Sequence, residues 1–332
     1  MFKRGYSSLD AGEEIQDSSK ICAIITAFNP TNLFEAVLMR VVEQIKDVIV
    51  IDNSVEDSAT EYTNKIINSI ILGDAADGKK INMHVVHNKN NGGISRAFNI
   101  GVDYGAFLGC QFFLFLDQDS LIEKNAVNEL IINYNFLIKH FKVGGISCAN
   151  IEANRDIFQN LSENFYQKHY VKNYLYKRDG IKEKYFLISS GLFIPKKVVC
   201  QVGSFDEDLF LDSVDHEFCL RLLENNYHFF VIESSKIFHS LGQLTKIKIW
   251  KFEFTVSIHT PARSFYMIRD TLIMFYKHWN KKFLLSSVLL FSLILSTTLK
   301  LILLPQKGEY LRNAIGGFSS FISWNSKKRS KS

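Results

Sequence analysis

The sequence has 332 residues, of which 47% are hydrophobic and 13% aromatic, and it contains only four prolines. A chain of this length and composition buries a large core, which excludes an intrinsically disordered protein. The formal net charge is +5, and much of the excess comes from the last residues, Lys327, Lys328, Arg329 and Lys331. The rest of the chain carries no stripe of basic residues, so we expect no binding to nucleic acid.

The first twenty residues and the cysteines indicate a protein of the cytoplasm. Residues 1–20 are polar and of mixed charge, with no apolar run that would form a signal peptide. The five cysteines form no Cys-x-x-Cys pair, are odd in number and lie in apolar segments. We therefore expect buried free thiols, as in proteins of a reducing compartment.

Residues 21–52 have the pattern of a strand, a helix and a second strand. The apolar run 21–27 predicts a buried strand, and the next helix begins near Asn32, where Glu35 completes the pattern of a capping box. A second apolar run, 48–51, ends in Asp52. This order predicts a right-handed unit of two parallel strands, with Asp52 at the carboxyl edge of the sheet.

A pair of glycines follows the third predicted strand. The elements expected here are a helix over 58–72, a strand over 83–87 and a helix over 94–108. The turn at Gly92 and Gly93 lacks the glycine spacing of a dinucleotide-binding loop and the Lys-Ser/Thr of a P-loop, so neither a Rossmann dinucleotide site nor an NTPase is supported. Arg96 is placed to reach a diphosphate; the alternative is a solvated helix arginine.

The apolar run 112–116 predicts the central strand of the sheet, buried on both faces. It ends at Asp117, and Asp119 follows two residues later. In an open α/β sheet, ligands bind outside the carboxyl ends of the strands. Mg²⁺ and Mn²⁺ prefer oxygen ligands and take few carboxylates plus phosphate oxygens, so this spacing favours a divalent ion held against a diphosphate. The alternative is a turn that ends the strand.

The elements beyond residue 120 continue an α/β fold. We expect a helix over 122–141 and strands over 143–149, 185–195 and 228–233. The polar segment 151–184 has no clear period and is expected to form a loop region over the site. Gly191 lies in the middle of the strand over 185–195, where a glycine often marks the close approach of a ligand.

Four motifs at the predicted strand ends resemble those of family 2 glycosyltransferases, and most closely their rhamnosyltransferase branch. They are Ala-Phe-Asn-Pro at 27–30, Val-Ile-Val-Ile-Asp-Asn-Ser at 48–54, Asn-x-Asn-x-Gly-Gly-Ile-Ser-Arg-Ala-x-Asn-x-Gly at 88–101 and Phe-Leu-Asp-Gln-Asp-Ser at 115–120. The resemblance extends over residues 20–280. It implies a GT-A fold, with a Rossmann-like, mostly parallel sheet and flanking helices. It also implies an inverting transfer from a nucleotide-diphosphate sugar that uses Mn²⁺ or Mg²⁺.

Carried onto this sequence, the resemblance implies three groups of site residues. The nucleotide sugar would be bound by Phe28, Asn29, Asp52, Arg96, Asp117 and Gln118. Asp52 would meet the base or nucleoside, and Asp117 the ribose side. The metal ligands would be Asp119 and His239, unless His239 is a hydrogen-bonded structural histidine. The acceptor or phosphate would be contacted by Gly191, Asp212, Arg263, Tyr266 and Arg269. The family usually has Asn after the second of these arginines, where this chain has Asp270.

The segment 203–221 contains six acidic residues among nineteen, interrupted by Phe and Leu, as in the lining of a cleft. An inverting transfer needs a carboxylate that takes the proton of the acceptor hydroxyl. Asp215, at the start of a helix predicted over 215–225, is the candidate base, because the helix N-terminus favours its ionised form. An N-cap is the alternative role for Asp215, and Asp212 is a second candidate base. Glu217 and Arg221, four residues apart, are expected to pair.

The last quarter of the sequence changes character. Residues 283–304 contain one charge, and as a helix they would be about 33 Å long, enough to cross a bilayer. Both flanks are basic, however, and therefore favour the cytoplasmic side. We expect a helical hairpin or an in-plane helix on an anionic inner leaflet, with Phe318, Phe321 and Trp324 at the interface. Burial in a dimer is the alternative.

The sequence thus predicts a polar tail over 1–20, a GT-A catalytic domain over 21–270 and a C-terminal helical membrane-associating region with a basic tail over 271–332. The expected function is transfer of a sugar, rhamnose from dTDP-rhamnose, onto a lipid-linked saccharide in O-antigen or capsule synthesis. The protein would be peripheral or monotopic at the cytoplasmic face of the bacterial inner membrane, with a homo-oligomer possible. A transferase that uses a UDP-sugar and a noncatalytic saccharide-binding scaffold are the alternatives.

Overall fold

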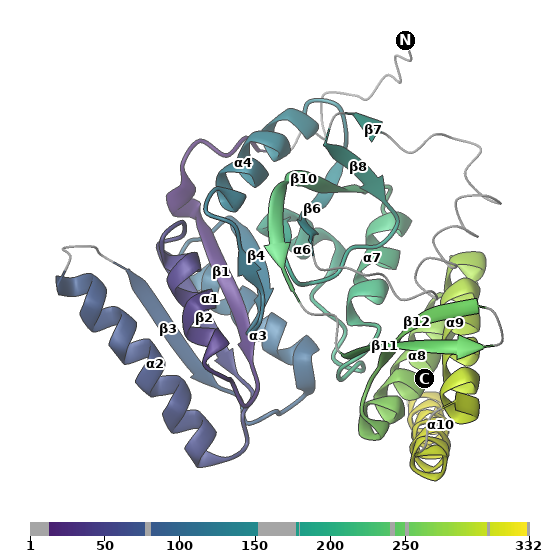
Figure 1. The fold of residues 1–332 in the computed structure, drawn as a ribbon. Coiled ribbons are helices and arrows are strands. Elements are labelled where there is room, and N and C mark those ends of the chain that lie inside the picture. The colour runs from purple at the N-terminus through teal and green to yellow at the C-terminus, as the bar shows by residue number, and fades with distance from the viewer. Residues whose placement is uncertain are drawn as a thin grey trace.

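The computed structural model describes residues 13–76, 81–151, 177–178, 180–239, 243–249, 252–303 and 306–330. Figure 1 shows a twisted sheet with helices on both faces, and beside it a lobe of three helices and a two-stranded ribbon. Most of the loop region predicted over 151–184 lies outside the described residues, as do residues 1–12 of the predicted tail.

Ten of the described strands form one sheet, in the order β3-β2-β1-β4-β9-β6-β10-β8-β7, with β5 paired to β10. These strands are β1 (Ile21–Ala27), β2 (Asp47–Asp52), β3 (Asn82–His87), β4 (Phe112–Asp117), β5 (Leu121–Ile122), β6 (Val143–Asn150), β7 (Lys177–Arg178), β8 (Ile181–Lys184), β9 (Leu192–Pro195) and β10 (His228–Phe238). The ribbon is β11 (Gln243–Ile249) with β12 (Phe252–Ile258).

The sheet is mixed, but most of its strands run in the same direction, so the prediction of a mostly parallel sheet is confirmed in part. The strands β3, β2, β1 and β4 are parallel neighbours, and β6 is parallel to β10. Strand β9 runs antiparallel to both β4 and β6, and β5, β7 and β8 are antiparallel to their neighbours. All four residues of β9 are buried, so its composition matches that of a buried parallel strand and does not reveal its direction.

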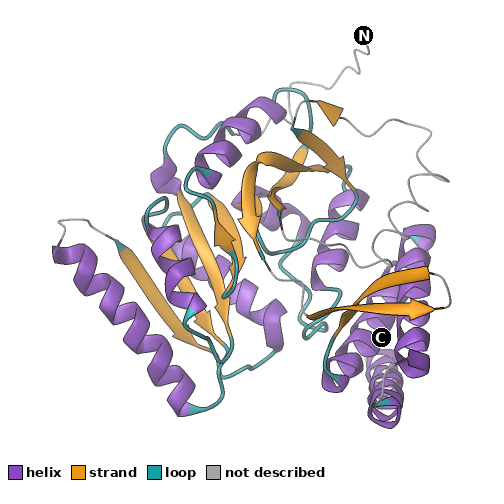
Figure 2. Ribbon diagram, viewed as in Figure 1, coloured by secondary structure: helices purple, strands orange, loops and turns teal. Residues whose placement is uncertain are grey.

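Helices cover both faces of this sheet (Figure 2). The covering helices are α1 (Leu33–Val42), α2 (Asp57–Ala76), α3 (Gly93–Phe107), α4 (Ala126–Leu137), α6 (Lys196–Val202) and α7 (Val214–Glu224), and the lobe beside the sheet contains α8 (Pro261–His278), α9 (Phe283–Leu303) and α10 (Lys307–Arg329). A single 3-10 turn, Ser18–Lys20, precedes β1. Buried side chains of α1, α2 and α4 share one core cluster, and those of α3, α6 and α7 share another.

Strand β4 lies between the two cores, because its side chains alternate in direction along the strand. Phe112, Leu114 and Leu116 belong to the cluster with α1 and α4, whereas Phe113 and Phe115 belong to the cluster with α3 and α7. All five side chains are buried. The prediction of a central strand covered on both faces is confirmed, and this burial fixes the position of Asp117 at its end.

Several predicted boundaries are wrong. The strand expected over 185–195 is only β9, since Gly191 lies in the turn before it with a φ of 86°. Residues 121–122 pair with β10 as β5, so the helix expected from 122 begins at Ala126. Strand β10 continues past the predicted end at 233 to Phe238. In the described contacts, the side chain of Asn32 makes no capping hydrogen bond.

The predicted burial of the cysteines holds for four of the five. Cys200, in α6, is exposed, whereas the cysteines at 22, 110, 148 and 219 are buried. All five cysteines are free thiols.

The helices α8, α9 and α10 form the C-terminal lobe. Helix α10 crosses α8 closely at Gly317, where a Cβ would lie 2.4 Å from the backbone oxygen of Phe265. Trp324 and Phe321 pack against Tyr276 of α8, so these two aromatic side chains face the protein, while Phe318 is exposed. Among the described helices, none combines the length and apolarity that a bilayer crossing requires.

Candidate active site

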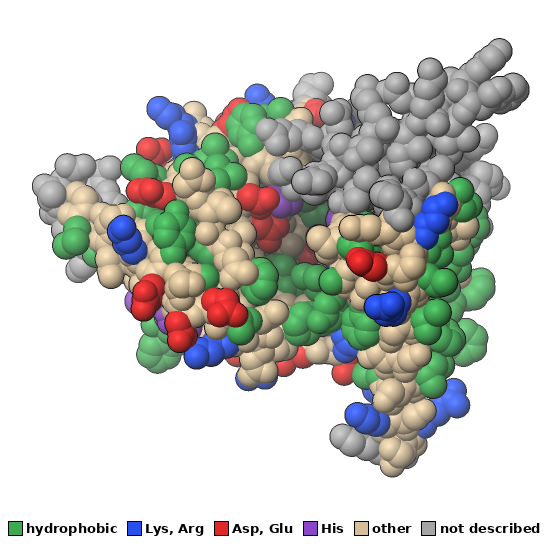
Figure 3. All heavy atoms as spheres, turned by 60° about the horizontal axis from the view of Figure 1, so that its bottom comes forward, with side chains coloured by type: hydrophobic (Ala, Val, Ile, Leu, Met, Phe, Trp, Pro, Cys, Tyr) green, Lys and Arg blue, Asp and Glu red, His purple; other side chains and the backbone are tan. Residues whose placement is uncertain are grey.

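Two carboxylates and a histidine converge beyond the end of β4. The antiparallel pairing of β5 with the end of β10 places Leu121 opposite Phe238, and it thereby brings His239 beside the acidic residues that precede β5. His239 Nδ1 lies 3.1 Å from Asp119 Oδ1, and its Nε2 lies 3.7 Å from Asp117 Oδ2. Figure 3 shows acidic and histidine side chains in a recess near the centre of the view.

The donor atoms of Asp117, Asp119 and His239 fit a divalent ion. One ligand atom from each lies within 4.8 Å of the other two. Two carboxylate oxygens and an imidazole nitrogen suit Mn²⁺, and the carboxylates also suit Mg²⁺. We refer to these three residues as the acidic triad.

The environment of the acidic triad perturbs the protonation of its members. Burial raises the pKa of Asp117 above its ordinary value, and the charge of Asp119 adds to this effect. Burial alone would lower the pKa of His239, but the hydrogen bond to Asp119 and the charges of Asp117 and Asp119 outweigh it and raise this pKa. The triad therefore attracts positive charge, either a proton or a cation.

The ends of β1 and β2 are joined to the end of β4 by hydrogen bonds. The backbone N–H of Phe28 donates to Gln118 Oε1 at 2.7 Å, and that of Asn29 donates to Ser54 Oγ at 2.8 Å. The backbone N–H of Ser54 in turn donates to Asp52 Oδ1 at 2.8 Å. The predicted donor-binding residues Phe28, Asn29, Asp52 and Gln118 thus lie along one edge of the sheet with the acidic triad.

Asp52 itself is fully buried, with 0% of the residue exposed. Its Oδ2 lies 3.2 Å from the Nδ1 atom of His87, the last residue of β3. His87 was not among the residues predicted from the sequence. The sequence did contain a signal for it, because His87 ends a predicted strand five residues before the Gly92–Gly93 turn.

Arg96 takes no part in the hydrogen bonds described above. Its guanidinium pairs with Glu207 at 3.6 Å, and both side chains are largely exposed. The start of α3 is instead held by the chain before α7: the backbone N–H of Ile94 donates to the Phe210 oxygen at 2.8 Å. A Cβ at Gly93 would lie 2.0 Å from this same oxygen, which requires glycine there. A contact between Arg96 and a diphosphate stays a prediction.

Asp215 lies in the first turn of α7, one residue after the helix begins at Val214. Burial raises the pKa of Asp215 to about 7, and the charge of Asp117 contributes, against the hydrogen bonds from Ser189. The hydroxyl of Ser189 is 3.5 Å from Asp215 Oδ2, while Ser190 bonds to Ser120. Ser120 is 3.2 Å from the triad histidine. The adjacent Ser189 and Ser190, together with Ser120, therefore connect Asp215 with the acidic triad.

The alternative role of Asp215 as the N-cap of α7 is wrong. The N-cap residue is Ser213, which has a left-handed φ of 58°, and its backbone N–H donates to Asp212 Oδ1 at 3.0 Å. Asp215 therefore does not cap the helix. Glu217 and Arg221 pair at 2.8 Å, as predicted, and Glu217 also lies 3.1 Å from His278.

The three residues of the Arg-x-x-Tyr-x-x-Arg pattern lie on α8 and have different surroundings. Arg263 is 3.6 Å from Asp212 and its side chain is 43% exposed, so it remains accessible to a ligand. The ring of Tyr266 stacks on Phe210, with centroids 4.6 Å apart. Arg269 donates to Asp270 at 2.8 Å and to the backbone oxygen of residue 208 at 2.9 Å. Contacts within the protein thus occupy Arg269.

Asp270 is fully buried and holds the chain that leads into α7. Its Oδ2 accepts hydrogen bonds from the backbone N–H groups of Phe210, Leu211 and Asp212, at 3.1, 2.9 and 3.0 Å. Burial raises its pKa to about 6, although the amide hydrogen bonds and Arg269 oppose this effect. We call residues 210–212 the amide turn. Sequence reasoning noted Asp270 only as a departure from the family pattern.

Gly191 occupies a close approach between strands. Its N–H donates to the oxygen of Phe115 at 2.9 Å, and its own oxygen accepts from the N–H of Cys148 at 3.1 Å. With a positive φ and a virtual Cβ 3.1 Å from the Cβ of Cys148, the position favours glycine for backbone reasons. A contact between Gly191 and an acceptor stays a prediction.

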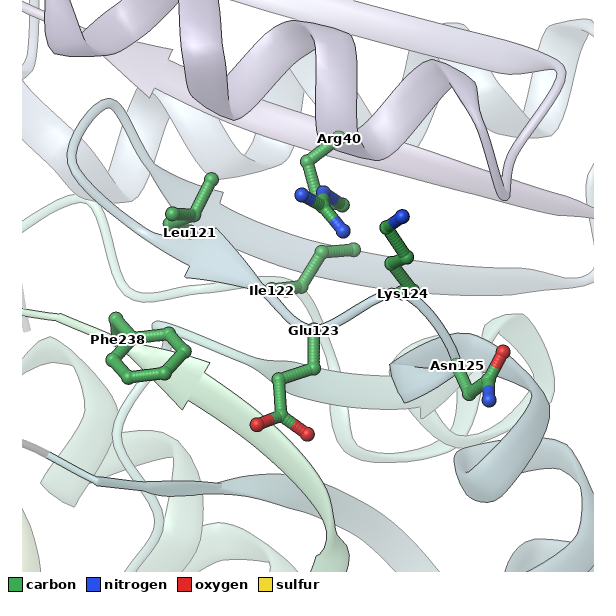
Figure 4. A pocket seen from close by; sticks show the side chains of 7 residues that line it. All are labelled: Arg40, Leu121, Ile122, Glu123, Lys124, Asn125 and Phe238. Carbon is green, nitrogen blue, oxygen red and sulfur yellow. The ribbon is translucent and has the colours of Figure 1, made fainter.

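A separate cavity of about 320 Å³ lies beside the β5–β10 pair. It is lined by Arg40, Leu121, Ile122, Glu123, Lys124, Asn125 and Phe238 (Figure 4). These lining residues include none of the predicted site residues. The lining includes Phe238, the neighbour of His239 in the chain, but no member of the acidic triad.

Comparisons with known proteins agree with this fold. The sequence profile described as Glycosyl transferase family 2 matches residues 22–194, and that described as Glycosyl transferase family group 2 matches residues 112–306. A Shigella flexneri protein named dTDP-rhamnosyl transferase RfbF is 30% identical over 312 residues, which are 90% of this chain and 94% of that protein.

Solved structures of S. aureus TarS share the fold. The complex of TarS 1-349 with UDP-GlcNAc has a TM-score of 0.53 at 13% identity, covering 91% of this chain and 80% of that one. A longer TarS structure has a TM-score of 0.52 at 14% identity and covers 91% of this chain, which spans 48% of that structure. Together with the profile matches, these likenesses show that the protein is a glycosyltransferase of family 2 with a GT-A fold.

Proposed function

We propose that the protein transfers rhamnose from dTDP-rhamnose to a lipid-linked saccharide, with inversion, in the synthesis of a bacterial surface polysaccharide such as O-antigen or capsule. The observation that carries this proposal is the 30% identity, over 90% of the chain, with a protein named as a dTDP-rhamnosyl transferase. The site supports it, because the half-buried carboxylate of Asp215 and the acidic triad are connected at one edge of the sheet.

In the proposed reaction Asp215 is the general base. Its carboxylate takes the proton of an acceptor hydroxyl while that oxygen forms a bond to the anomeric carbon of the donor. The bond from the anomeric carbon to the diphosphate oxygen breaks on the opposite face, and the nucleoside diphosphate leaves with the electron pair. A base with a pKa of about 7 is substantially ionised at neutral pH and still basic enough to accept a proton.

The acidic triad would hold a divalent ion on the donor side. Such an ion, when bound, stabilises the negative charge of a diphosphate. Asp117 and Asp119 supply oxygen ligands, and His239 supplies a nitrogen ligand that favours Mn²⁺ over Mg²⁺. On the acceptor side, Arg263 is the accessible cation nearest to Asp212 in the described contacts, and we assign it to the acceptor.

The proposal also includes an anionic lipid surface as the partner of the C-terminal lobe. Leu311, Ile315, Phe318 and Ile322 are exposed and lie on one face of α10, at intervals of three and four residues. On α9, Phe283, Phe291 and Ile294 are exposed as well. In the sequence from 277 onward, ten Lys and Arg residues accompany one acidic residue, Glu309.

This combination of exposed apolar residues and basic charge fits a helix that lies in the interface of an anionic membrane. Figure 3 shows hydrophobic and basic side chains next to one another on the C-terminal part of the molecule. Membrane binding would bring the site to a lipid-linked acceptor at the cytoplasmic face. It would also explain why a monomer exposes so many large apolar side chains.

Donor and catalysis are tested together with purified protein. Transfer is measured with dTDP-rhamnose, UDP-galactose and UDP-GlcNAc, each with and without Mn²⁺, for the native protein and for Asp215→Asn and Asp119→Ala. We expect transfer from dTDP-rhamnose alone and its loss in both variants. Transfer only from a UDP-sugar would replace the proposed donor, and full activity in both variants would refute the assigned roles. If the protein binds sugars but transfers none from any of the three donors, the result would favour a noncatalytic saccharide-binding scaffold.

Membrane binding is tested by flotation with vesicles that contain or lack anionic lipid. We expect the native protein to float with the anionic vesicles, and the double variant Ile315→Ser, Phe318→Ser to remain in solution. Ile132→Ser on α4 removes an equally exposed isoleucine and should leave flotation unchanged. If the native protein stays unbound and forms dimers that the double variant lacks, the surface is an oligomer interface and the lipid proposal is wrong.

A further inference from the structure

The cavity beside the β5–β10 pair has the size of a small-molecule site. Its volume of about 320 Å³ lies at the lower end of the roughly 300–1,000 Å³ that such sites occupy, which suits a ligand about the size of one sugar. The lining side chains come from α1, from β5 and the chain between β5 and α4, and from the end of β10. None of them belongs to the acidic triad, so a ligand here would not occupy the proposed donor site.

Two cations of the lining have few partners. The guanidinium of Arg40 is 3.5 Å from Glu43, beyond the roughly 2.7–2.9 Å of a hydrogen-bonded ion pair, although the Arg40 side chain is only 27% exposed. Within the described part of the chain, Lys124 forms no ion pair. In Figure 4 the charged ends of both side chains point into the cavity, whereas the carboxylate of Glu123 points away from them. Because the two cations repel each other, an anion between them would be attracted by both.

The rest of the lining fits the other parts of a sugar. Asn125 is the N-cap residue of α4, yet its side chain makes no capping hydrogen bond. Its amide can therefore donate to one hydroxyl and accept from another. Phe238 and Leu121, which are register partners in the β5–β10 pair, supply apolar surface for the C–H face of a sugar ring. The combination matches a sugar that carries negative charge.

Hydrogen bonds fix the walls of this cavity. The side chain of Gln44, just after α1, donates to the backbone oxygen of Glu123 at 2.9 Å and accepts from the N–H of Val127 at 3.1 Å. The N–H of Glu123 donates to the backbone oxygen of Lys236 at 3.0 Å. The segment 123–127 is thus tied to the end of α1 and to β10. A site whose walls are held in place loses less conformational entropy when a ligand binds.

We propose that this cavity is a second binding site, for a sugar that carries a phosphate or a carboxylate group. Arg40 and Lys124 bind the anionic group. Asn125 bonds to a hydroxyl, and the sugar ring packs on Phe238. A carboxylate sugar would be a constituent of a polysaccharide, whereas a sugar phosphate would be a free small molecule. These two sources share one chemistry and differ in the anionic group that the site prefers.

The site is tested by calorimetric titration of the full-length protein with glucose 1-phosphate, glucuronate, glucose and inorganic phosphate. We expect an anionic sugar to bind more tightly than either glucose or inorganic phosphate. Arg40→Gln and Lys124→Gln should each weaken this binding roughly tenfold or more, as the loss of a hydrogen bond to a charged group does. A preference for glucuronate identifies a constituent of a polysaccharide, and a preference for glucose 1-phosphate identifies a free sugar phosphate.

Two control variants separate this site from the general surface and from the donor site. Lys65→Gln removes an exposed lysine of α2 and should leave binding of the anionic sugar unchanged. Asp119→Asn alters the acidic triad and should also leave it unchanged. The inference is overturned if neither anionic sugar binds, if inorganic phosphate binds as tightly as they do, or if both cavity variants retain native affinity. Loss of binding in Asp119→Asn would place the sugar at the triad and would overturn it as well.

Discussion

Replacing Asp270 by alanine should strongly destabilise the amide turn, which precedes α7. One carboxylate oxygen of Asp270 accepts three backbone N–H groups of the amide turn, and Arg269 pairs with the other oxygen at 2.8 Å. A buried donor left without an acceptor costs about 1–3 kcal/mol. At the lowest value for each of three amides, the loss is about 3 kcal/mol, a large part of the roughly 5–15 kcal/mol that stabilises a protein.

The same substitution should also lower catalysis. The amide turn leads through Ser213 into α7, so its displacement moves Asp215 relative to the donor. We expect kcat to fall more than the donor affinity, because the donor-side residues are held by other contacts. Asp270→Asn keeps an oxygen acceptor and should be intermediate in both stability and kcat.

Urea denaturation measures the stability effect, and transfer from the donor measures the kinetic effect. The matched control is Asp103→Ala, which removes an exposed aspartate on α3 and should change stability by less than about 0.5 kcal/mol. The reasoning is refuted if Asp270→Ala unfolds at the same urea concentration as Asp103→Ala, or if it retains native kcat.

Three further results are expected. The kcat/KM of transfer should rise as the pH passes through about 7 and then level off, because Asp215 acts in its ionised form above its raised pKa; a flat profile between about pH 6 and 8 would contradict this role. Asp119→Asn should weaken calorimetric Mn²⁺ binding by more than roughly tenfold, and unchanged binding would remove Asp119 from the metal site. Gly317→Ala should destabilise the protein by about 1–3 kcal/mol, because its Cβ would overlap the Phe265 oxygen. Gly308→Ala is the control and should not destabilise it, since a Cβ there meets nothing within 4 Å. Equal melting temperatures for the two variants would show that α10 is not packed this closely against α8.

The strand ends were the part of the fold that could be predicted best. The run at 112–116 is apolar throughout and that at 21–27 is apolar except for Thr26, so the burial of both strands followed from the pattern. Strand β9 was harder, because four buried residues carry no information on whether their neighbours are parallel. Its antiparallel direction depends on contacts with β4 and β6 that are distant in sequence.

The candidate site was predicted for residues whose position follows from a strand end. Asp117, Asp119 and His239 meet as the Asp-x-Asp spacing and the family resemblance implied. The same reasoning could not identify Asp270, because the hydrogen bonds that matter are donated by backbone groups sixty residues away. His87 was missed because an Asp–His pair across two parallel strands depends on register, which a single sequence does not reveal.

The pairing of β5 with the end of β10 has a consequence for the order in which the protein matures. Asp119 and His239 are 120 positions apart in the chain, so a ribosome must deliver more than two-thirds of the polypeptide before both can meet. Contacts of such long sequence separation form late in folding. A nascent chain that ends after β5 would hold both carboxylates without their histidine, and the three ligands could meet only once residue 239 had been synthesised.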